Sequence, residues 1–137
     1  NSFMRIISKG DGDTEYYLDF RGDATDRFRF VVIGGGVGFT TANNFGSPST
    51  GTWCFVLGWH DATANTVNIQ INNGTVNSVS HSTGVTSSTG TFSIGGVPGG
   101  YFDGLIGPVM FWKRVLTSDE RTDLYNSGSG RAYSYFS

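Results

Sequence analysis

The run from Thr66 to Asn72, within the segment from residue 64 to 72, alternates strictly between polar and apolar side chains. Its apolar residues are Val67, Ile69 and Ile71, and the polar residues between them are Asn68 and Gln70. A period of two predicts a β-strand with its apolar face on a core and its polar face toward solvent. Asn73-Gly74 follows at once, and this pair is a strong signal for a type I′ hairpin turn. The chain is therefore expected to contain antiparallel strands joined by tight turns.

Similar strand patterns occur on both sides of this segment. They cover Ser2–Ser8, Thr14–Phe20, Arg27–Ile33, Trp53–Asp61 and Thr91–Gly96. Tyr16, Leu18 and Phe20 share one face of the second strand, and Phe28 and Phe30 are expected to face inward from the third. The 21 glycines and a charged content of only 15% suit an all-β domain with many turns. A length of 137 residues suits one domain.

The segment Tyr101–Leu124 combines a strand signal with a helix signal. Gly104 opens a run that ends at Trp112 and is apolar in both parities, which predicts a largely buried strand. Pro108 cannot donate a ladder hydrogen bond, so it marks a bulge or an edge position. Residues 117–120, Thr-Ser-Asp-Glu, form a capping box, which predicts a short helix after the strand. Gly128 is expected to end that helix in the left-handed conformation.

This segment resembles the closing segment of concanavalin A-like, laminin-G-type sandwich domains. Those domains typically read G-x-I-D-E-V-x-I-Y-N-R-A-L-[ST]-x-x-E-[IV]-x-x-L-Y. The positions that match by identity or by type are Gly104, Ile106, Val109, Phe111, Trp112, Arg114, Leu116, Thr117, Glu120, Leu124 and Tyr125. Gly107 and Pro108 depart from the pattern, where Asp and Glu are usual. Trp53–Ile71 is a second matching block.

The resemblance implies an all-β fold, an antiparallel two-sheet jelly-roll β-sandwich with one short C-terminal helix, over residues 1–137. In that family one or two further strands usually precede a segment like Ile6–Asp11. We therefore expect the chain to be the C-terminal part of a larger polypeptide, with a gap in its first sheet filled by another chain or by further residues. A first residue that is Asn and not Met is in keeping with a processed product or an excised piece.

Charge and hydropathy exclude several classes of partner. A net charge of −2 gives no field that would attract nucleic acid. No apolar run approaches the roughly 20 residues that a membrane helix needs. Between Phe30 and Trp112 the only charged side chains are Asp61 and Asp103. A neutral surface rich in hydroxyls and amides is common on secreted, cell-surface and virion proteins, so an extracellular location is expected.

The carboxylates do not form a glycanase motif. Glycanases that share this sandwich carry E-x-D-x-x-E on one strand, where alternate carboxylates act as nucleophile and acid. The chain has no such triplet. Glu15 and Asp19, four residues apart on an extended strand, would lie about 13 Å apart, farther than either glycosidase geometry allows. The chain also has no G-x-S-x-G motif, the turn that presents a nucleophilic serine in many hydrolases. No catalytic residue is predicted, and the chain is expected not to be an enzyme.

Two classes of non-catalytic function remain. Thr40–Thr52 is a long polar loop, and long loops on β scaffolds often carry binding function. A glycan is the leading ligand, and its predicted binding residues are Phe39, Asn43, Asn44, Phe45, Tyr101 and Asp103. The alternative is a structural subunit of a capsid, fibre or surface assembly, which contacts sister or parent chains and no sugar. An incomplete first sheet favours this alternative because it invites strand donation.

Calcium is the one cofactor that the residues suggest. Its candidate ligands are Asp11, Asp13 and Asp103, each in a glycine-flanked turn, although solvated turn aspartates explain the same pattern and no EF-hand spacing is present. Arg21-Gly22-Asp23 is an RGD triplet, which can serve as an integrin ligand when a loop displays it. A turn rich in glycine and aspartate produces this triplet easily by chance.

Overall fold

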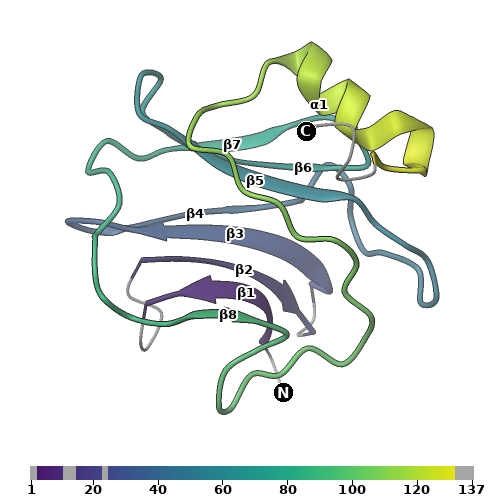
Figure 1. The fold of residues 1–137 in the computed structure, drawn as a ribbon, viewed down its shortest axis with the longest axis horizontal. Coiled ribbons are helices and arrows are strands. Elements are labelled where there is room, and N and C mark those ends of the chain that lie inside the picture. Colours follow the sequence, from purple (N-terminus) through teal and green to yellow (C-terminus); the bar gives the residue numbers. More distant parts are fainter. Residues whose placement is uncertain (1–2, 11–14, 23–24, 132–137) are drawn as a thin grey trace.

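The computed structural model describes residues 3–10, 15–22 and 25–131 and shows two antiparallel β-sheets packed face to face (Figure 1). The strands are β1 (Met4–Lys9), β2 (Tyr16–Arg21), β3 (Arg27–Ile33), β4 (Val37–Thr41), β5 (Val56–Asp61), β6 (Thr66–Ile71), β7 (Asn77–Ser80) and β8 (Phe92–Ile94). The order is β4-β3-β2-β1-β8 in the five-stranded sheet and β5-β6-β7 in the three-stranded sheet. Helix α1 (Ser118–Tyr125) and the 3₁₀ turn η1 (Asn126–Gly128) follow. The predicted two-sheet sandwich with one short C-terminal helix is confirmed.

The core lies between the sheets and is built from the apolar parities that the sequence predicts. Phe28 and Phe30 of β3 are buried and pair in register with Phe20 and Leu18 of β2. On the facing sheet, the β6 residues with the same inward parity, Val67 and Ile69, are fully buried. Burying each such side chain stabilises the fold by about 1.5–3 kcal/mol.

A β-bulge in β1 changes which of its residues face the core. Ile7 pairs with Leu18 and Arg5 pairs with Asp19, so Ile6 is an additional residue with no partner position on β2. Two residues of one strand that are two apart normally point the same way. Because of the bulge, Ile7 points inward with Leu18 while Arg5 points outward with Asp19.

The hairpin after β6 is confirmed, but its turn lies one residue earlier than predicted. Asn72 and Asn73 both have positive φ, 51° and 55°. The Gly74 amide donates to the Ile71 carbonyl oxygen at 2.8 Å, which closes the turn. A type I′ turn needs positive φ at both central residues, and asparagine tolerates that conformation better than most residues. The two central residues of the turn are therefore Asn72 and Asn73, whereas the sequence predicted Asn73 and Gly74.

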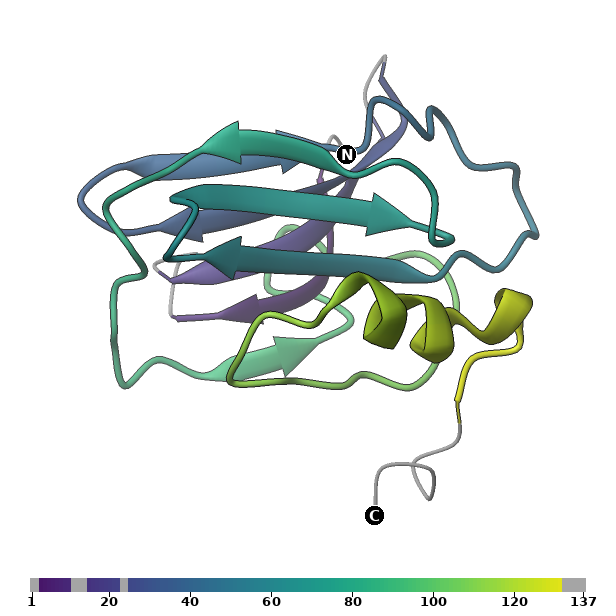
Figure 2. The same cartoon turned by 90° about the horizontal axis from the view of Figure 1, so that it is seen from above.

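Helix α1 lies alongside β5 in Figure 2, and its Arg121 side chain reaches the outward polar face of β6. The Arg121 guanidinium donates to Gln70 Oε1 at 3.0 Å and lies 4.8 Å from the centre of the Trp59 ring. The Gln70 amide nitrogen donates to the Gly74 carbonyl oxygen at 2.8 Å. Gln70 has the predicted outward parity, yet it is buried and is hydrogen-bonded to Arg121 and Gly74.

The capping box of α1 is present as predicted. The Glu120 amide donates to Thr117 Oγ1 at 3.2 Å, and the Thr117 amide donates to the Glu120 carboxylate at 2.8 Å. The predicted end at Gly128 is wrong. Asn126, with φ 46°, takes the left-handed position, and its amide donates to the Thr122 carbonyl oxygen. Asparagine is the usual second choice after glycine at this position.

The predicted buried strand from Gly104 to Trp112 is not formed. After a single bridge between Tyr101 and Arg5, the chain runs irregularly to α1 along the side of the sandwich (Figure 1). Leu105 is 80% exposed, and Phe111 is also exposed. A strand needs a partner for its backbone groups, and none lies alongside this run in the part of the chain that the structure describes. Pro108 also has no N–H to donate.

The predicted start of a strand at Trp53 is also wrong. The strand begins at Val56, and Trp53 is 65% exposed on the preceding loop, close to Gly107. Within the described ranges, β5 pairs only with β6, so the three-stranded sheet ends there. The expectation that this domain is part of a larger chain whose strands complete the sandwich stays a prediction.

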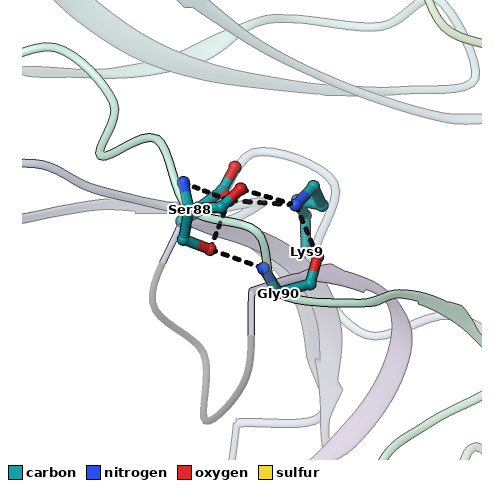
Figure 3. Close-up of polar contacts among 4 residues, drawn as sticks. Lys9, Ser88 and Gly90 are labelled. Carbon is teal, nitrogen blue, oxygen red and sulfur yellow. Dashed lines mark hydrogen bonds and ion pairs between the residues drawn. The ribbon is translucent and has the colours of Figure 1, made fainter.

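A polar cluster ties the segment before β8 to the β1–β2 hairpin (Figure 3). The Lys9 ammonium donates to Glu15 at 3.0 Å and to the carbonyl oxygen of Gly90 at 2.6 Å. The Ser88 hydroxyl and amide donate to the same Glu15 oxygen at 2.6 and 2.8 Å. The Ser88 hydrogen bonds, with the help of Lys9 and against the effect of burial, lower the pKa of Glu15. Glu15 is therefore a structural carboxylate.

Candidate ligand-binding site

The outer face of the five-stranded sheet carries a cluster of arginine and aromatic side chains. We name it the arginine face. It consists of Arg5, Tyr17, Asp19, Arg21, Arg27, Arg29 and Phe39, with Tyr101 beside it. The Phe3 ring lies on this face, 5.1 Å from the Arg21 guanidinium and 5.2 Å from that of Arg29. These strand residues alternate with the core residues, so they point away from the three-stranded sheet.

The strand register places the charged residues in two rows. Arg5, Asp19 and Arg29 are neighbours across β1, β2 and β3. In the next row, Arg21 and Arg27 stand directly opposite each other on β2 and β3. Side chains directly opposite on one face of an antiparallel pair are close enough to interact. Among the described residues, the fold thus places four arginines and Asp19 on one face of the sheet, and two of these arginines contact Asp19.

Asp19 is fully buried at the centre of this face. Arg29 donates from Nε to Oδ1 at 3.1 Å and from Nη2 to Oδ2 at 2.6 Å, and Arg5 donates from Nη1 to Oδ2 at 2.5 Å. The two bonds from Arg29 are the bidentate geometry that guanidinium and carboxylate groups prefer. Burial acts to lower the pKa of Arg29, but the hydrogen bonds and charge of Asp19 outweigh it and raise that pKa. Arg29 therefore stays charged.

Aromatic rings pack against these guanidinium groups. The Arg5 guanidinium lies 3.8 Å from the centre of the Tyr17 ring, and that of Arg29 lies 5.7 Å from the centre of the Phe39 ring. Cations over ring faces at such distances are attracted to them. The arginine side chains are therefore held in place by both the carboxylate and the rings.

Two exposed rings stand at opposite sides of the face. Phe39 on β4 is 49% exposed, and Tyr101 is 66% exposed. Tyr101 bridges Arg5 in a parallel arrangement, so it lies on the far side of β1 and its side chain shares the face of Arg5. Four steps between neighbouring strands separate Tyr101 from β4, a span of about 19 Å. Such a span accommodates an extended ligand of several rings.

Three of the six predicted ligand-binding residues lie on the arginine face or contact it. Phe39 and Tyr101 lie on the arginine face, and the Asn43 side-chain oxygen accepts from Arg27 Nη1 at 3.2 Å. The Asn44 backbone amide donates to Asn77 Oδ1 on the three-stranded sheet at 3.1 Å. Phe45 lies partly exposed on the loop after β4, and Asp103 is exposed on the loop after Tyr101.

Sequence reasoning missed Arg5, Tyr17, Asp19 and Arg29. The signal was present in β2 and β3, where the polar parity carries charged residues at Asp19, Arg27 and Arg29. The apolar residues of these strands indicate the core, whereas the charged residues between them mark the opposite face. For Arg5 no alternation signal exists, since the bulge at Ile6 reverses its direction.

The fold and the family agree. Residues 1–120 match the laminin G model described as the concanavalin A-like lectin/glucanases superfamily. The chain belongs to this superfamily. No curated protein and no solved structure gives a significant match to the chain. Laminin-G-type domains are typically non-catalytic binding modules, although the superfamily also includes glucanases.

The two carboxylates considered for catalysis belong to separate clusters in this laminin-G-type domain. Glu15 precedes β2 and is bound by Lys9 and Ser88, whereas Asp19 is bound by Arg5 and Arg29. A lowered pKa makes Glu15 a poor general acid, because such a group must be protonated near its working pH.

The predicted calcium ligands are not brought together by the described part of this domain. Asp11 and Asp13 lie outside the described residues, as does Asp23 of the RGD triplet. Asp103 is exposed, and no group of three His, Cys, Asp or Glu side chains suited to a metal occurs within residues 3–10, 15–22 and 25–131. Calcium binding stays a prediction. None of the described helices is long and apolar enough to cross a bilayer.

Proposed function

We propose that this domain is a non-catalytic recognition module that binds a glycan across the arginine face. The observation that carries this proposal is the pair of exposed rings, Phe39 and Tyr101, at opposite sides of a row of fixed hydrogen-bond donors. Flat aromatic faces suit the C–H faces of sugar rings, and fixed donors suit hydroxyl oxygens. Asn43 and the outer guanidinium nitrogens supply the hydrogen bonds.

The proposed setting is a secreted, cell-surface or virion protein of which this domain is one module. The stretch between Phe30 and Trp112 has only Asp61 and Asp103 as charged residues, so most of the surface around the arginine face is neutral and hydroxyl-rich. Such a surface limits non-specific electrostatic binding and leaves the arginine face as the distinct charged feature.

The test is binding of purified protein to a glycan array. Phe39→Ala and Tyr101→Ala should each abolish or strongly reduce binding, because each removes one stacking surface. Trp53→Ala is the matched control, since Trp53 is 65% exposed, almost the same as Tyr101, and lies near Gly107, away from the arginine face. Binding that survives both substitutions, or silence across the array, would contradict the proposal.

A second function, that of a structural subunit, is supported by β5, which has no second strand partner among the described residues. Within the described ranges this strand pairs only with β6, and edge strands are templates for pairing with another chain. The occupant would be a strand from a sister copy, as in strand donation. Concentration-dependent assembly in sedimentation experiments, together with no glycan binding, would favour this function over recognition. A monomer at all concentrations would remove it.

A further inference from the structure

We propose that Asn73 is the acceptor of an N-linked glycan in a secreted form of this domain, and that the first sugar lies in a hollow beside α1. The inference goes beyond ligand recognition and rests only on the proposed secreted or cell-surface setting. Asn73-Gly74-Thr75 is an N-glycosylation sequon, and no other triplet of the chain reads N-x-S or N-x-T. The sequence therefore offers one acceptor asparagine.

The structure places this sequon at the hairpin turn between β6 and β7. Asn73 is a central residue of the turn and is partly buried, whereas Gly74 and Thr75 are exposed. The hydrogen bond that closes the turn joins the Gly74 amide to the Ile71 carbonyl oxygen. Because both of these groups belong to the backbone, a substituent on the Asn73 side chain leaves that bond in place. The turn can therefore carry a sugar and keep its conformation.

A hollow of about 520 Å³ lies beside the Asn73 side chain and is open to solvent. Asn73 Nδ2 donates to Thr122 Oγ1 of α1 at 3.0 Å, so the nitrogen that would carry the sugar stands at the wall of the hollow. A volume of this size is ordinary for a small-molecule site. A sugar bonded to Nδ2 would therefore start beside α1. The lining includes Asn73, Asp119, Thr122, Tyr125, Asn126 and Ser127.

The lining suits a neutral group with hydroxyls. The Asp119 carboxylate is exposed and accepts no hydrogen bond from the residues that the structure describes, so both of its oxygens are open to a donor. Sugar hydroxyls are donors of this kind. An anion would be repelled by Asp119, and an apolar group would gain no hydrogen bond from it.

The modification forms one bond and breaks one. Asn73 Nδ2 bonds to the anomeric carbon of a sugar carried on a lipid pyrophosphate, and the bond from that carbon to the pyrophosphate oxygen breaks. The pyrophosphate leaves with the electron pair, and Nδ2 loses one proton to the transferring enzyme. One N–H group remains on Nδ2, so the side chain keeps a donor for Thr122.

The first experiment measures the mass of the full chain secreted from a eukaryotic host, before and after release of N-linked glycans by a glycosidase. Wild type and Thr75→Ser should lose mass on this treatment, because both keep the sequon. Thr75→Val has a similar shape without the hydroxyl and should show no loss. Thr75 is exposed, so all three chains should fold. An unmodified wild-type chain, or a glycan that persists in Thr75→Val, would overturn the inference.

The second experiment tests the position of the first sugar. An endoglycosidase trims the glycan to that sugar, and the melting temperature is compared with that of the same sequence made without a glycan in a bacterial host. The sugar should raise the melting temperature by about 3 °C. Asp119→Ala should reduce this increase to about half or less, while Asp103→Ala, at an exposed position elsewhere, should leave it unchanged.

No increase, or the same increase in Asp119→Ala as in wild type, would overturn the placement in the hollow. Neither result depends on the glycan array. An unmodified Asn73 would leave the proposed recognition of a glycan standing, and silence across the array would leave this modification standing.

Discussion

The residue that organises the arginine face is Asp19. It is fully buried and accepts hydrogen bonds from both Arg5 and Arg29. A buried charge is tolerated only when it is paired, and two guanidinium groups that converge on one site need the carboxylate between them. Asp19 is thus required for stability and for the positions of the donors that would meet a ligand.

Asp19→Asn tests this role. The substitution keeps the shape of the side chain but removes its charge, so two largely buried guanidinium groups lose their counter-ion. The expected loss is about 3–5 kcal/mol in the free energy of unfolding, measured by urea denaturation. Asp103→Asn, at an exposed position, should change that free energy by no more than about 0.5 kcal/mol. Similar values for the two variants would show that the buried cluster contributes little.

At the scale of elements, α1 is held by its capping box and by Arg114. The Arg114 guanidinium donates to both oxygens of Glu120 at 2.6 and 2.7 Å. The pKa of Glu120 is lowered from 4.5 to about 2. The largest cause is the hydrogen bonding from Arg114, and the next is the hydrogen bond from the Thr117 amide. Because the folded-state pKa is depressed, the contribution of Glu120 is complete above pH 4.5 and is lost as pH falls toward 2.

Glu120→Gln tests the pH dependence of this contribution. The wild-type melting temperature should fall more between pH 4.5 and 2 than that of the variant, because the substituted amide has no carboxylate to protonate. Thermal melts by circular dichroism across this range measure the difference. Asp119→Asn is the control, since it removes a neighbouring carboxylate that takes no part in the capping box. Parallel pH profiles for wild type and Glu120→Gln would contradict the assignment.

Local signals predicted some elements well and others poorly. The alternation in β6 and the Thr117 capping box depend on nearby residues only, so the sequence was sufficient for them. The run from Gly104 to Trp112 has strand-like composition, but a strand also requires a partner, and composition carries no information about one. The arginine face required the register between β2 and β3, which depends on the whole sheet. Predicted residues such as Phe45 reflected loop length rather than position on that face.

At the scale of the whole molecule, the two sheets share one interior. Phe30 of β3 contacts the backbone of Gly58 on β5 so closely that a Cβ there would lie 2.5 Å from the ring. Val67 and Ile69 of β6 complete the layer opposite the five-stranded sheet. Neither sheet can bury its apolar face without the other, so the domain should unfold as a unit.

Ile69→Ala tests this cooperativity. The cavity left by a fully buried isoleucine should reduce the free energy of unfolding by about 2–5 kcal/mol. The midpoints from tryptophan fluorescence and from far-ultraviolet circular dichroism should shift together in urea. Val79→Ala, on an exposed position of β7, should have a much smaller effect. Separate midpoints for the two probes would show that the sheets are independent.

The bulge at Ile6 has a consequence for comparing this chain with its relatives. One additional residue in β1 turns Arg5 away from the interior, so that Arg5 joins Arg29 in binding Asp19. A homologue with one residue fewer in that hairpin would keep the same sandwich and the same overall composition, yet lose the ion pair between Arg5 and Asp19. The length of a single strand, counted residue by residue, is therefore a better guide to shared ligand recognition than overall similarity.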